Sequence, residues 1–564
     1  MSSAPFESQT ELDREIARLE QQLLDLKQRR NAMSPVSRIP PELLSNIFFL
    51  SLRFLKAGGI TEEVDPDMTR RAICAVSHQW RELAFTEPKL WMEIHVRETT
   101  IRRTTATKYY LNLVRKNLRE TQDVYLEAGR ILNPGAVRHI LEVEKTRLKR
   151  VVLGATSEII REILSRMTDA QCDKVDSVEL KCDNIQRPAD VGVLQHMRVF
   201  PHLRKLWHEL PLIPNAAYVG RLANLTDLVL VNLRSFTVED VHQLFDILTR
   251  AKHLTSFTLA STQSATHNPL RVSAGGAVRT TEIEFHHLKR FELQLGLTPL
   301  LLALLKPLRF YGEMERVVIA TDDIKGVDFN GLVIYTMALA FSHMSAPETM
   351  KMGVNPEVLY TKSDGDAALL TYQAGWVDKP DRQLYMVLPV QEDISDPFAT
   401  PIHPYLSLPF GDPHSWLLNN IQEMEVGTRP IQPVWECFAR IPSLRRLSVT
   451  AWDMNDYFIP ALRLKGFESP DNPPNPAQVA APFPALLDIK IDMAELATSG
   501  LDVEYARTLA QALGERAANG SEREDSVRRI CKLEFVSCTS QIDGETRDLL
   551  SGVASEVCWN MKKK

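Results

Sequence analysis

The sequence predicts a mixed α+β fold, in which an N-terminal helical part precedes a long array of short strands and return helices. Two observations carry this prediction. Apolar residues within about the first ninety positions recur at the three- and four-residue spacing of amphipathic helices. From about residue 120 onward, a short strand pattern returns at intervals of 22 to 34 residues along its early copies. At 564 residues the chain is long enough for several domains or a repeat array.

The first predicted element is a helix from about Glu11 to Arg30. Its apolar residues recur at alternating spacings of four and three, with charged and amide side chains between them; they are Leu12, Ile16, Leu19, Leu23 and Leu26. This spacing is the a/d seam of a coiled coil. A seam of little more than two heptads leaves two interpretations open: the helix pairs with itself or with a partner helix, or it packs back on its own chain.

A second helical segment follows the Ser and Pro residues at 34–38. Proline suits the first turn of a helix, and the apolar spacing predicts a helix from about Glu42 to Leu55, ended by Gly58 and Gly59. After an acidic loop, Val76 to Ala84 again draw one helical face. The sequence Thr86-Glu87-Pro88 ends that face, and Leu90-Trp91 provide an apolar closure.

The later strand pattern consists of an apolar residue, two spacers, an apolar residue, one spacer and another apolar residue. Its copies are Leu148/Val151/Leu153, Val175/Val178/Leu180, Leu203/Leu206/His208, Leu225/Leu228/Leu230, Leu254/Phe257/Leu259, Leu288/Phe291/Leu293, Met314/Val317/Ile319, Leu444/Leu447/Val449, Leu486/Ile489/Ile491 and Ile530/Leu533/Phe535. A single strand with its return helix cannot bury its apolar face, whereas stacked neighbours share a continuous core. We therefore expect a solenoid, with Val238 to Arg250 as one return helix. Residues from about 325 to 430 fit the pattern poorly, and 469–481 read as a surface loop.

The sequence lacks the short motifs that mark common catalytic or metal sites. Gly326 to Gly331 lack the lysine of a phosphate-binding loop, and His208-Glu209 is not followed by the second histidine of a zinc protease. The cysteine pairs are too widely spaced for a zinc knuckle, and His286-His287 has no third ligand in pattern. We expect no enzyme activity, no cofactor and no metal.

Charge and targeting signals restrict the partners further. The formal net charge of −6 gives no overall attraction to nucleic acid or to an anionic membrane. The basic stretch from Arg102 to Arg119 has apolar residues at helical spacing, which favours an amphipathic helix with a solvated basic face over a phosphate site. No secretory signal or membrane-spanning run is visible, and seven scattered cysteines suit reduced thiols. We expect a cytoplasmic or nuclear protein with protein partners.

Two stretches together resemble the F-box motif. They are Ile39-Pro40-Pro41-Glu42-Leu43-Leu44-Ser45-Asn46-Ile47-Phe48 and Ala75-Val76-Ser77-His78-Gln79-Trp80-Arg81-Glu82-Leu83-Ala84, closed by Pro88-Lys89-Leu90-Trp91. The layout is similar to F-box proteins of mushroom-forming fungi, which carry a short heptad helix before the motif and leucine-rich-like repeats after it. Ser77 departs from the cysteine that is frequent there, and the connection between the helices is long. The asparagine or cysteine expected at the ninth position of a leucine-rich repeat is absent almost everywhere, and only Cys538, counted from Ile530, fits.

The resemblance implies a non-catalytic substrate-recognition subunit of a Skp-cullin-F-box ubiquitin ligase. It implies three parts: a heptad helix at 1–34, a three-helix F-box domain at 35–95, and a leucine-rich-repeat-like solenoid at 96–564 that binds an unknown protein target. The implied contacts to the Skp-type adaptor, which links the chain to a cullin, come from Ile39, Pro40, Leu43, Leu44, Ile47, Phe48, Val76 and Trp80. The alternative is a non-catalytic scaffold that acts outside a ligase, with pairing through Leu12 to Leu26.

Overall fold

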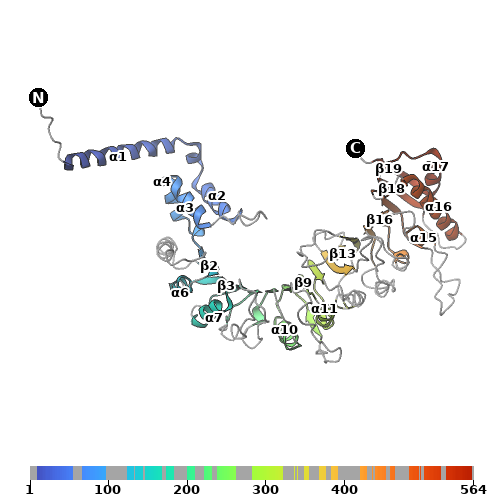
Figure 1. Cartoon of the computed structure of the whole chain (residues 1–564), viewed down its shortest axis with the longest axis horizontal. Coiled ribbons are helices and arrows are strands. Elements are labelled where there is room, and N and C mark those ends of the chain that lie inside the picture. The colour runs from blue at the N-terminus through green and yellow to red at the C-terminus, as the bar shows by residue number, and fades with distance from the viewer. Residues whose placement is uncertain are drawn as a thin grey trace. The chain divides into compact units, whose positions relative to one another are not determined.

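Figure 1 shows the computed structural model of the chain. The residues that it describes are 9–54, 66–96, 123–131, 134–143, 147–167, 173–182, 200–209, 222–231, 238–261, 282–296, 298–321, 336, 340, 348–354, 368–375, 383–390, 420–427, 435, 438–451, 458–463, 482–494, 496, 501–521 and 529–561. They confirm a mixed fold of helices and mainly parallel strands. The chain divides into two compact units, Met1–Leu203 and Arg204–Lys564, and we describe each by itself.

The first unit begins with helices and continues with strands. Its helical elements are α1 (Gln9–Ala32), the 3-10 turn η1 (Pro35–Arg38), α2 (Pro41–Phe54), α3 (Pro66–Val76), α4 (His78–Thr86) and η2 (Pro88–Leu90). The elements that follow are β1 (Glu93–Val96), β2 (Val124–Ile131), α6 (Pro134–Val143), β3 (Leu148–Ala155), α7 (Ser157–Arg166) and β4 (Ser177–Cys182). Strands β1 to β4 pair in parallel and in sequence order.

The helices largely follow the apolar spacing. The predicted helix from Glu11 to Arg30 lies within α1, and α2 begins and ends within one residue of its predicted bounds. The helical face drawn from Val76 to Ala84 is shared by two helices, because Ser77 has extended backbone (φ −157°, ψ 167°). The Ser77 hydroxyl accepts a hydrogen bond from the Trp80 amide at 3.1 Å, so Ser77 caps α4 instead of continuing α3.

The second unit alternates strands with helices. Its first half contains β5 (Lys205–Glu209), η4 (Leu222–Asn224), β6 (Asp227–Val231), α10 (Val238–Arg250), β7 (Ser256–Ala260), β8 (Ile283–Phe285), β9 (Arg290–Gln294), α11 (Thr298–Leu305), β10 (Leu308–Phe310) and β11 (Arg316–Ala320). Its second half contains β12 (Thr349–Val354), β13 (Ala368–Gly375), β14 (Gln383–Val390), β15 (Glu423–Val426), β16 (Arg446–Thr450), α15 (Phe458–Leu462), β17 (Asp488–Asp492), α16 (Asp502–Ser521), β18 (Ile530–Cys538), α17 (Gly544–Val553) and β19 (Ala554–Met561). The predicted return helix is confirmed as α10, and in Figure 1 α10 and α11 lie on one side of the neighbouring strands.

The repeated strand pattern supplies the core. No residue of the ten predicted copies is more than 3% exposed. In the second unit the register brings these residues opposite one another, as in the ladder from Leu228 through Phe257 and Phe291 to Val317. Such a ladder stacks the apolar side chains of successive strands into one continuous core, as the pattern predicted.

Residues 325–430, which fit the pattern poorly, contain a reversal of strand order. Strand β14 pairs in parallel with β11, β13 is antiparallel to both β14 and β12, and β12 pairs in parallel with β15. A copy of the pattern at Ile421, Met424 and Val426, which we did not predict, returns the chain to the parallel array at β15, and all three residues are buried.

Several predictions fall on positions outside the described residues. These are the glycines at 58–59, the basic stretch 102–119, the glycine-rich loop at 326–331, the surface loop at 469–481, and the parts of 325–430 between its strands. Within the described part of the chain, no helix has the length and apolar character needed to cross a membrane.

Candidate functional site

The helical segment formed by α2, α3 and α4 carries the predicted adaptor-binding residues, and its interior uses only some of them. Leu44 and Phe48 are 1% exposed, and they lie on the inner side of α2. The Phe48 ring lies 4.8 Å from the half-buried Trp80 ring of α4, measured between centroids. These contacts hold α2 against α4.

The other side of α2 presents apolar side chains to solvent. Leu43 is 55% exposed and Ile47 is 48% exposed, and the four-residue spacing places them on one helical face. Val76, the last residue of α3, is 55% exposed. Of the remaining predicted residues, Pro40 is exposed and Ile39 is half-buried. The structure therefore divides the predicted set into residues that pack inside the helical segment and apolar residues that are exposed to solvent.

Three further large apolar residues, two in this segment and one in the preceding turn η1, are exposed and were not predicted from the sequence. They are Val36, Leu50 and Met68. Leu50 follows Ile47 by three positions, so the helical spacing that selected Leu43 and Ile47 also contained the signal for Leu50. We call Leu43, Ile47, Leu50 and Val76 the exposed apolar set.

Buried polar contacts fix the end of the helical segment onto β1. The Arg70 guanidinium, 3% exposed, donates from Nε to the Leu90 carbonyl at 2.7 Å and from Nη2 to the Glu93 carbonyl at 2.8 Å. The indole nitrogen of buried Trp91 donates to the Ala84 carbonyl at 2.7 Å. The closing tryptophan is thus internal and bonds to α4, while Arg70 joins α3 to Leu90 and to the first residue of β1.

A second candidate surface is the outward face of the second unit's sheet. In its first half, the outward row in register contains Trp207, Val229, Thr258 and Glu292, and it ends at Val318 of β11, which is buried. Trp207 is 39% exposed. Burial raises the pKa of Glu292, which lies between Thr258 and Val318 in this row. An aromatic ring beside apolar and polar neighbours is a composition typical of protein-binding surfaces.

The second half of the same sheet presents charges of alternating sign. The outward row in register is Glu423, Arg446, Asp488, Lys532 and Glu556. Arg446 lies 2.5 Å from a Glu423 oxygen and 3.5 Å from an Asp488 oxygen. Because neighbouring charges compensate one another, this row forms a mixed polar surface without a strong net field.

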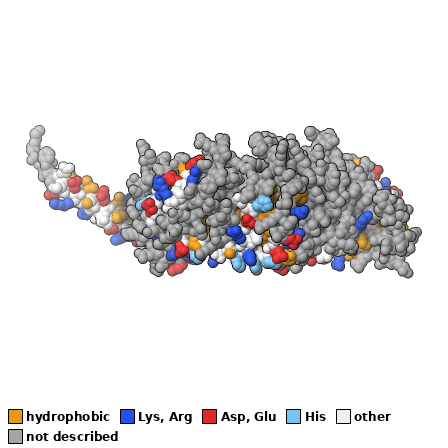
Figure 2. Space-filling model, turned by 90° about the horizontal axis from the view of Figure 1, so that it is seen from below, with side chains coloured by type: hydrophobic (Ala, Val, Ile, Leu, Met, Phe, Trp, Pro, Cys, Tyr) orange, Lys and Arg blue, Asp and Glu red, His pale blue; other side chains and the backbone are white. Residues whose placement is uncertain are grey.

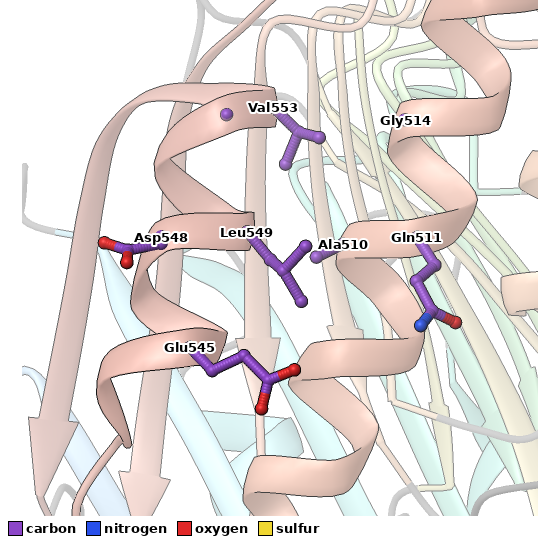
Figure 3. Close-up of a pocket in the computed structure, with 8 residues that line it drawn as sticks. Ala510, Gln511, Gly514, Glu545, Asp548, Leu549 and Val553 are labelled. Carbon is purple, nitrogen blue, oxygen red and sulfur yellow. The ribbon is translucent and has the colours of Figure 1, made fainter.

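A hollow of about 550 Å³ lies between α16 and α17. Figure 3 shows Leu549 and Ala510 pointing toward each other across it, with the Glu545 carboxylate one turn below Leu549 and Gln511 on the other side of α16. Its described lining contains no cysteine, histidine or lysine. The described lining holds carboxylates and an amide beside an apolar floor, with no cation to bind an anion, and we assign no catalytic chemistry to this hollow.

The ionisable groups around this helix pair stabilise the fold. Asp502 accepts hydrogen bonds from the amides of Thr539 and Ser540 at 2.9 and 2.8 Å, and these bonds hold its pKa below the ordinary value against the effect of burial. Arg516 donates to the carbonyls of Pro482 and Phe483, and burial lowers its pKa to about 10. Burial, with the Asp502 charge, raises the pKa of Cys538 to about 12, which makes this thiol a poor nucleophile.

The described residues contain no group of three or more His, Cys, Asp or Glu side chains placed to hold a metal ion. His286 instead stacks on Tyr311 with ring centroids 5.0 Å apart, and His287 stacks on His253 at 6.2 Å. The geometry therefore gives these two histidines surface stacking roles.

Comparison with known proteins adds no assignment. No protein-family model matches the chain, and no curated protein matches it significantly.

Proposed function

We propose that this chain is a substrate-recognition subunit of a Skp-cullin-F-box ubiquitin ligase. The observation that carries the proposal is the exposed apolar set on α2 and α3. A helix that stabilised only its own unit would turn such residues inward, since full burial of one aliphatic side chain is worth roughly 1.5–3 kcal/mol. Leu43 and Ile47 are left about half exposed while Leu44 and Phe48 fill the core.

The division of α2 into two faces suits a docking helix. Leu44 and Phe48 hold its position, and Leu43, Ile47 and Leu50 offer an apolar stripe at the i, i+4, i+7 spacing by which helices enter apolar grooves. The F-box resemblance over the same residues names the partner: the Skp-type adaptor, and through it a cullin. Ubiquitin transfer then belongs to other subunits, and this chain has no catalytic step.

The outward sheet face is the proposed site for the protein target. Its first half combines Trp207, Val229 and Thr258 in one row, and aromatic side chains are enriched at binding surfaces. The alternating charges of the second half would favour a target whose charges are opposite at each position, because a target with like charges at those positions would be repelled.

The test is co-purification of full-length chain with a purified Skp-type adaptor from a mushroom-forming fungus. The variant is Leu43→Asp with Ile47→Asp, which places two carboxylates in the proposed interface. We expect the wild-type chain to retain the adaptor and the variant to lose at least about a hundredfold in affinity, because a buried unpaired charge is costly.

The matched control is Leu24→Asp on α1, a leucine 48% exposed that lies outside α2, α3 and α4. This control should retain the adaptor fully, and all three proteins should unfold at the same temperature. A wild-type chain that fails to retain the adaptor contradicts the proposal, as does a double variant that binds unchanged.

A non-catalytic scaffold outside any ligase is the second candidate, and the exposed seam of α1 favours it. Leu12, Ile16, Leu19, Leu23 and Leu26 are 46–63% exposed. A chain that binds neither adaptor nor cullin but still associates through α1 would support the scaffold instead.

A further inference from the structure

Helix α1 carries a complete apolar seam that no described residue covers. Its five seam residues are each at least 46% exposed, whereas the apolar residues of the strand repeats are buried. Figure 2 shows hydrophobic side chains along the helix projecting at its left, with acidic and basic side chains beside them. A helix of 24 residues is about 36 Å long, at 1.5 Å per residue, so the seam is long enough for a partner helix.

The seam assigns every residue of α1 a heptad position. With Ile16 and Leu23 at position a and Leu12, Leu19 and Leu26 at position d, the flanking e positions hold Asp13, Glu20 and Lys27. The flanking g positions hold Glu15, Gln22 and Arg29. Acidic flanking residues therefore lie in the N-terminal half of α1 and basic ones in its C-terminal half.

This charge gradient disfavours a parallel pair. In a parallel coiled coil each g residue faces the e residue of the next heptad on the other helix. Glu15 would then face Glu20 of the second copy, twice by symmetry, and Gln22 would face Lys27. A parallel pair would thus contain like-charge contacts and no compensating attraction.

An antiparallel pair reverses the balance. There, e residues face e residues and g residues face g residues, with a opposite d in the core. In the register that centres α1 on itself, Asp13 faces Lys27 and Glu15 faces Arg29, each twice by symmetry. Glu20 and Gln22 each meet their own copy, and of these two contacts only that of Glu20 is between like charges. The same register stacks Ile16 on Leu26 and Leu19 on Leu23, which gives four fully apolar layers.

We propose that α1 pairs with α1 of a second copy of this chain as an antiparallel two-helix coiled coil. The apolar layers supply the affinity, and the charge gradient sets the orientation, which is the role that flanking charges have in coiled coils. This pairing is independent of the adaptor surface on α2, and it would bring two recognition chains together by their N-terminal helices.

The affinity is tested by sedimentation equilibrium of the full-length chain over a range of concentrations. The variant Leu19→Ala with Leu23→Ala removes the central layers, and alanine preserves the helix. We expect a concentration-dependent dimer for wild type and a dissociation constant at least about a hundredfold higher for the variant. The matched control is Leu24→Ala, a leucine 48% exposed on the same helix but off the seam, which should pair like wild type.

The orientation is tested by Glu15→Lys, because the two arrangements predict opposite signs. In the antiparallel pair the new lysine faces Arg29, and we expect the dissociation constant to rise about tenfold for two altered pairs. In a parallel pair the lysine would face Glu20 and tighten the dimer. Glu11→Lys, which changes the same charge at a position facing solvent, controls for the loss of an acidic residue near the helix N-terminus.

Three results would overturn the proposal. A wild-type chain that stays monomeric at all concentrations rules out self-pairing. A dimer that Leu19→Ala with Leu23→Ala leaves intact places the contact elsewhere. A dimer that Glu15→Lys tightens or leaves unchanged, relative to Glu11→Lys, rules out the antiparallel arrangement.

Discussion

The apolar residues of the strand repeats and those of α2 follow equally regular patterns, yet they have different fates. Every residue of the ten repeat copies is at most 3% exposed, whereas Leu43 and Ile47 are 55% and 48% exposed beside the buried Leu44 and Phe48. The repeat strands have one apolar face, and the stacking of neighbouring strands buries all of it. Helix α2 has two apolar sides, of which its own unit uses one.

The difference indicates which part of the chain has apolar surface that its own packing leaves exposed. In the repeats, the apolar residues of the pattern lie in the core and are not accessible to a partner. We therefore expect a target to bind the outward rows, such as the row that contains Trp207. In α2 the surplus apolar residues are evidence of a partner.

The largest expected effect is on the repeat core. Phe291→Ala removes a ring packed 5.7 Å from Phe257 and 4.9 Å from Phe310, between centroids. We expect a loss of about 3–5 kcal/mol in the local free energy of unfolding, because the tightly stacked strands cannot close the cavity. Hydrogen–deuterium exchange of peptides from β7 and β9 measures it.

Ile47→Ala provides the other side of this comparison. Because the Ile47 side chain is half exposed, its truncation should change the free energy of unfolding by no more than about 0.5 kcal/mol. If Ile47→Ala destabilises the chain as strongly as Phe291→Ala, the exposed apolar set belongs to the core and the comparison fails.

The second expected effect concerns the one polar member of the repeat pattern. His208 occupies an inward position on β5, is fully buried, and has no hydrogen-bond partner among the described residues for either ring nitrogen. Burial lowers the pKa of His208 to about 3. The unfolded chain binds this proton near pH 6.5 and the folded chain does not, so stability is lost as the pH falls below 6.5.

The expected slope is at most about 1.4 kcal/mol per pH unit between pH 6.5 and 3. Hydrogen exchange of β5 and β6 at a series of pH values measures it, with His208→Leu as the comparison. The leucine variant should restore the repeat pattern and remove this part of the pH dependence. An unchanged slope in His208→Leu would show that the histidine titrates normally.

The smallest expected effect is at the break between α3 and α4. Ser77→Ala removes the side-chain oxygen that caps α4, and we expect a loss of about 1 kcal/mol. Hydrogen exchange of peptides from α4, recorded at increasing temperature, measures this loss. Ser45→Ala, inside α2, is the matched control and should be neutral, since alanine favours a helix interior.

Sequence reasoning succeeded where burial follows local spacing. It gave α10 its bounds and found ten buried strand copies, because the return of an apolar residue at fixed intervals reports one face of an element. It missed the reversed order of β12, β13 and β14, since strand pairing over long separations leaves no local pattern.

The candidate site shows the same limit. The spacing selected Leu43, Leu44, Ile47 and Phe48 together, and it did not distinguish inward from outward members because four apolar residues in six positions cover two sides of a helix. Only the packing of Trp80 on Phe48 decides which side is internal. The role of Ser77 as a cap likewise depends on backbone conformation at one residue.

The most direct test of the central claim is a hydrogen-exchange footprint of the Skp-type adaptor on the full-length chain. The account predicts slower exchange on adaptor binding in peptides from α2 and α3, which carry the exposed apolar set, and unchanged exchange in the strand repeats. Protection located in the repeats, or no protection anywhere at saturating adaptor, would contradict it.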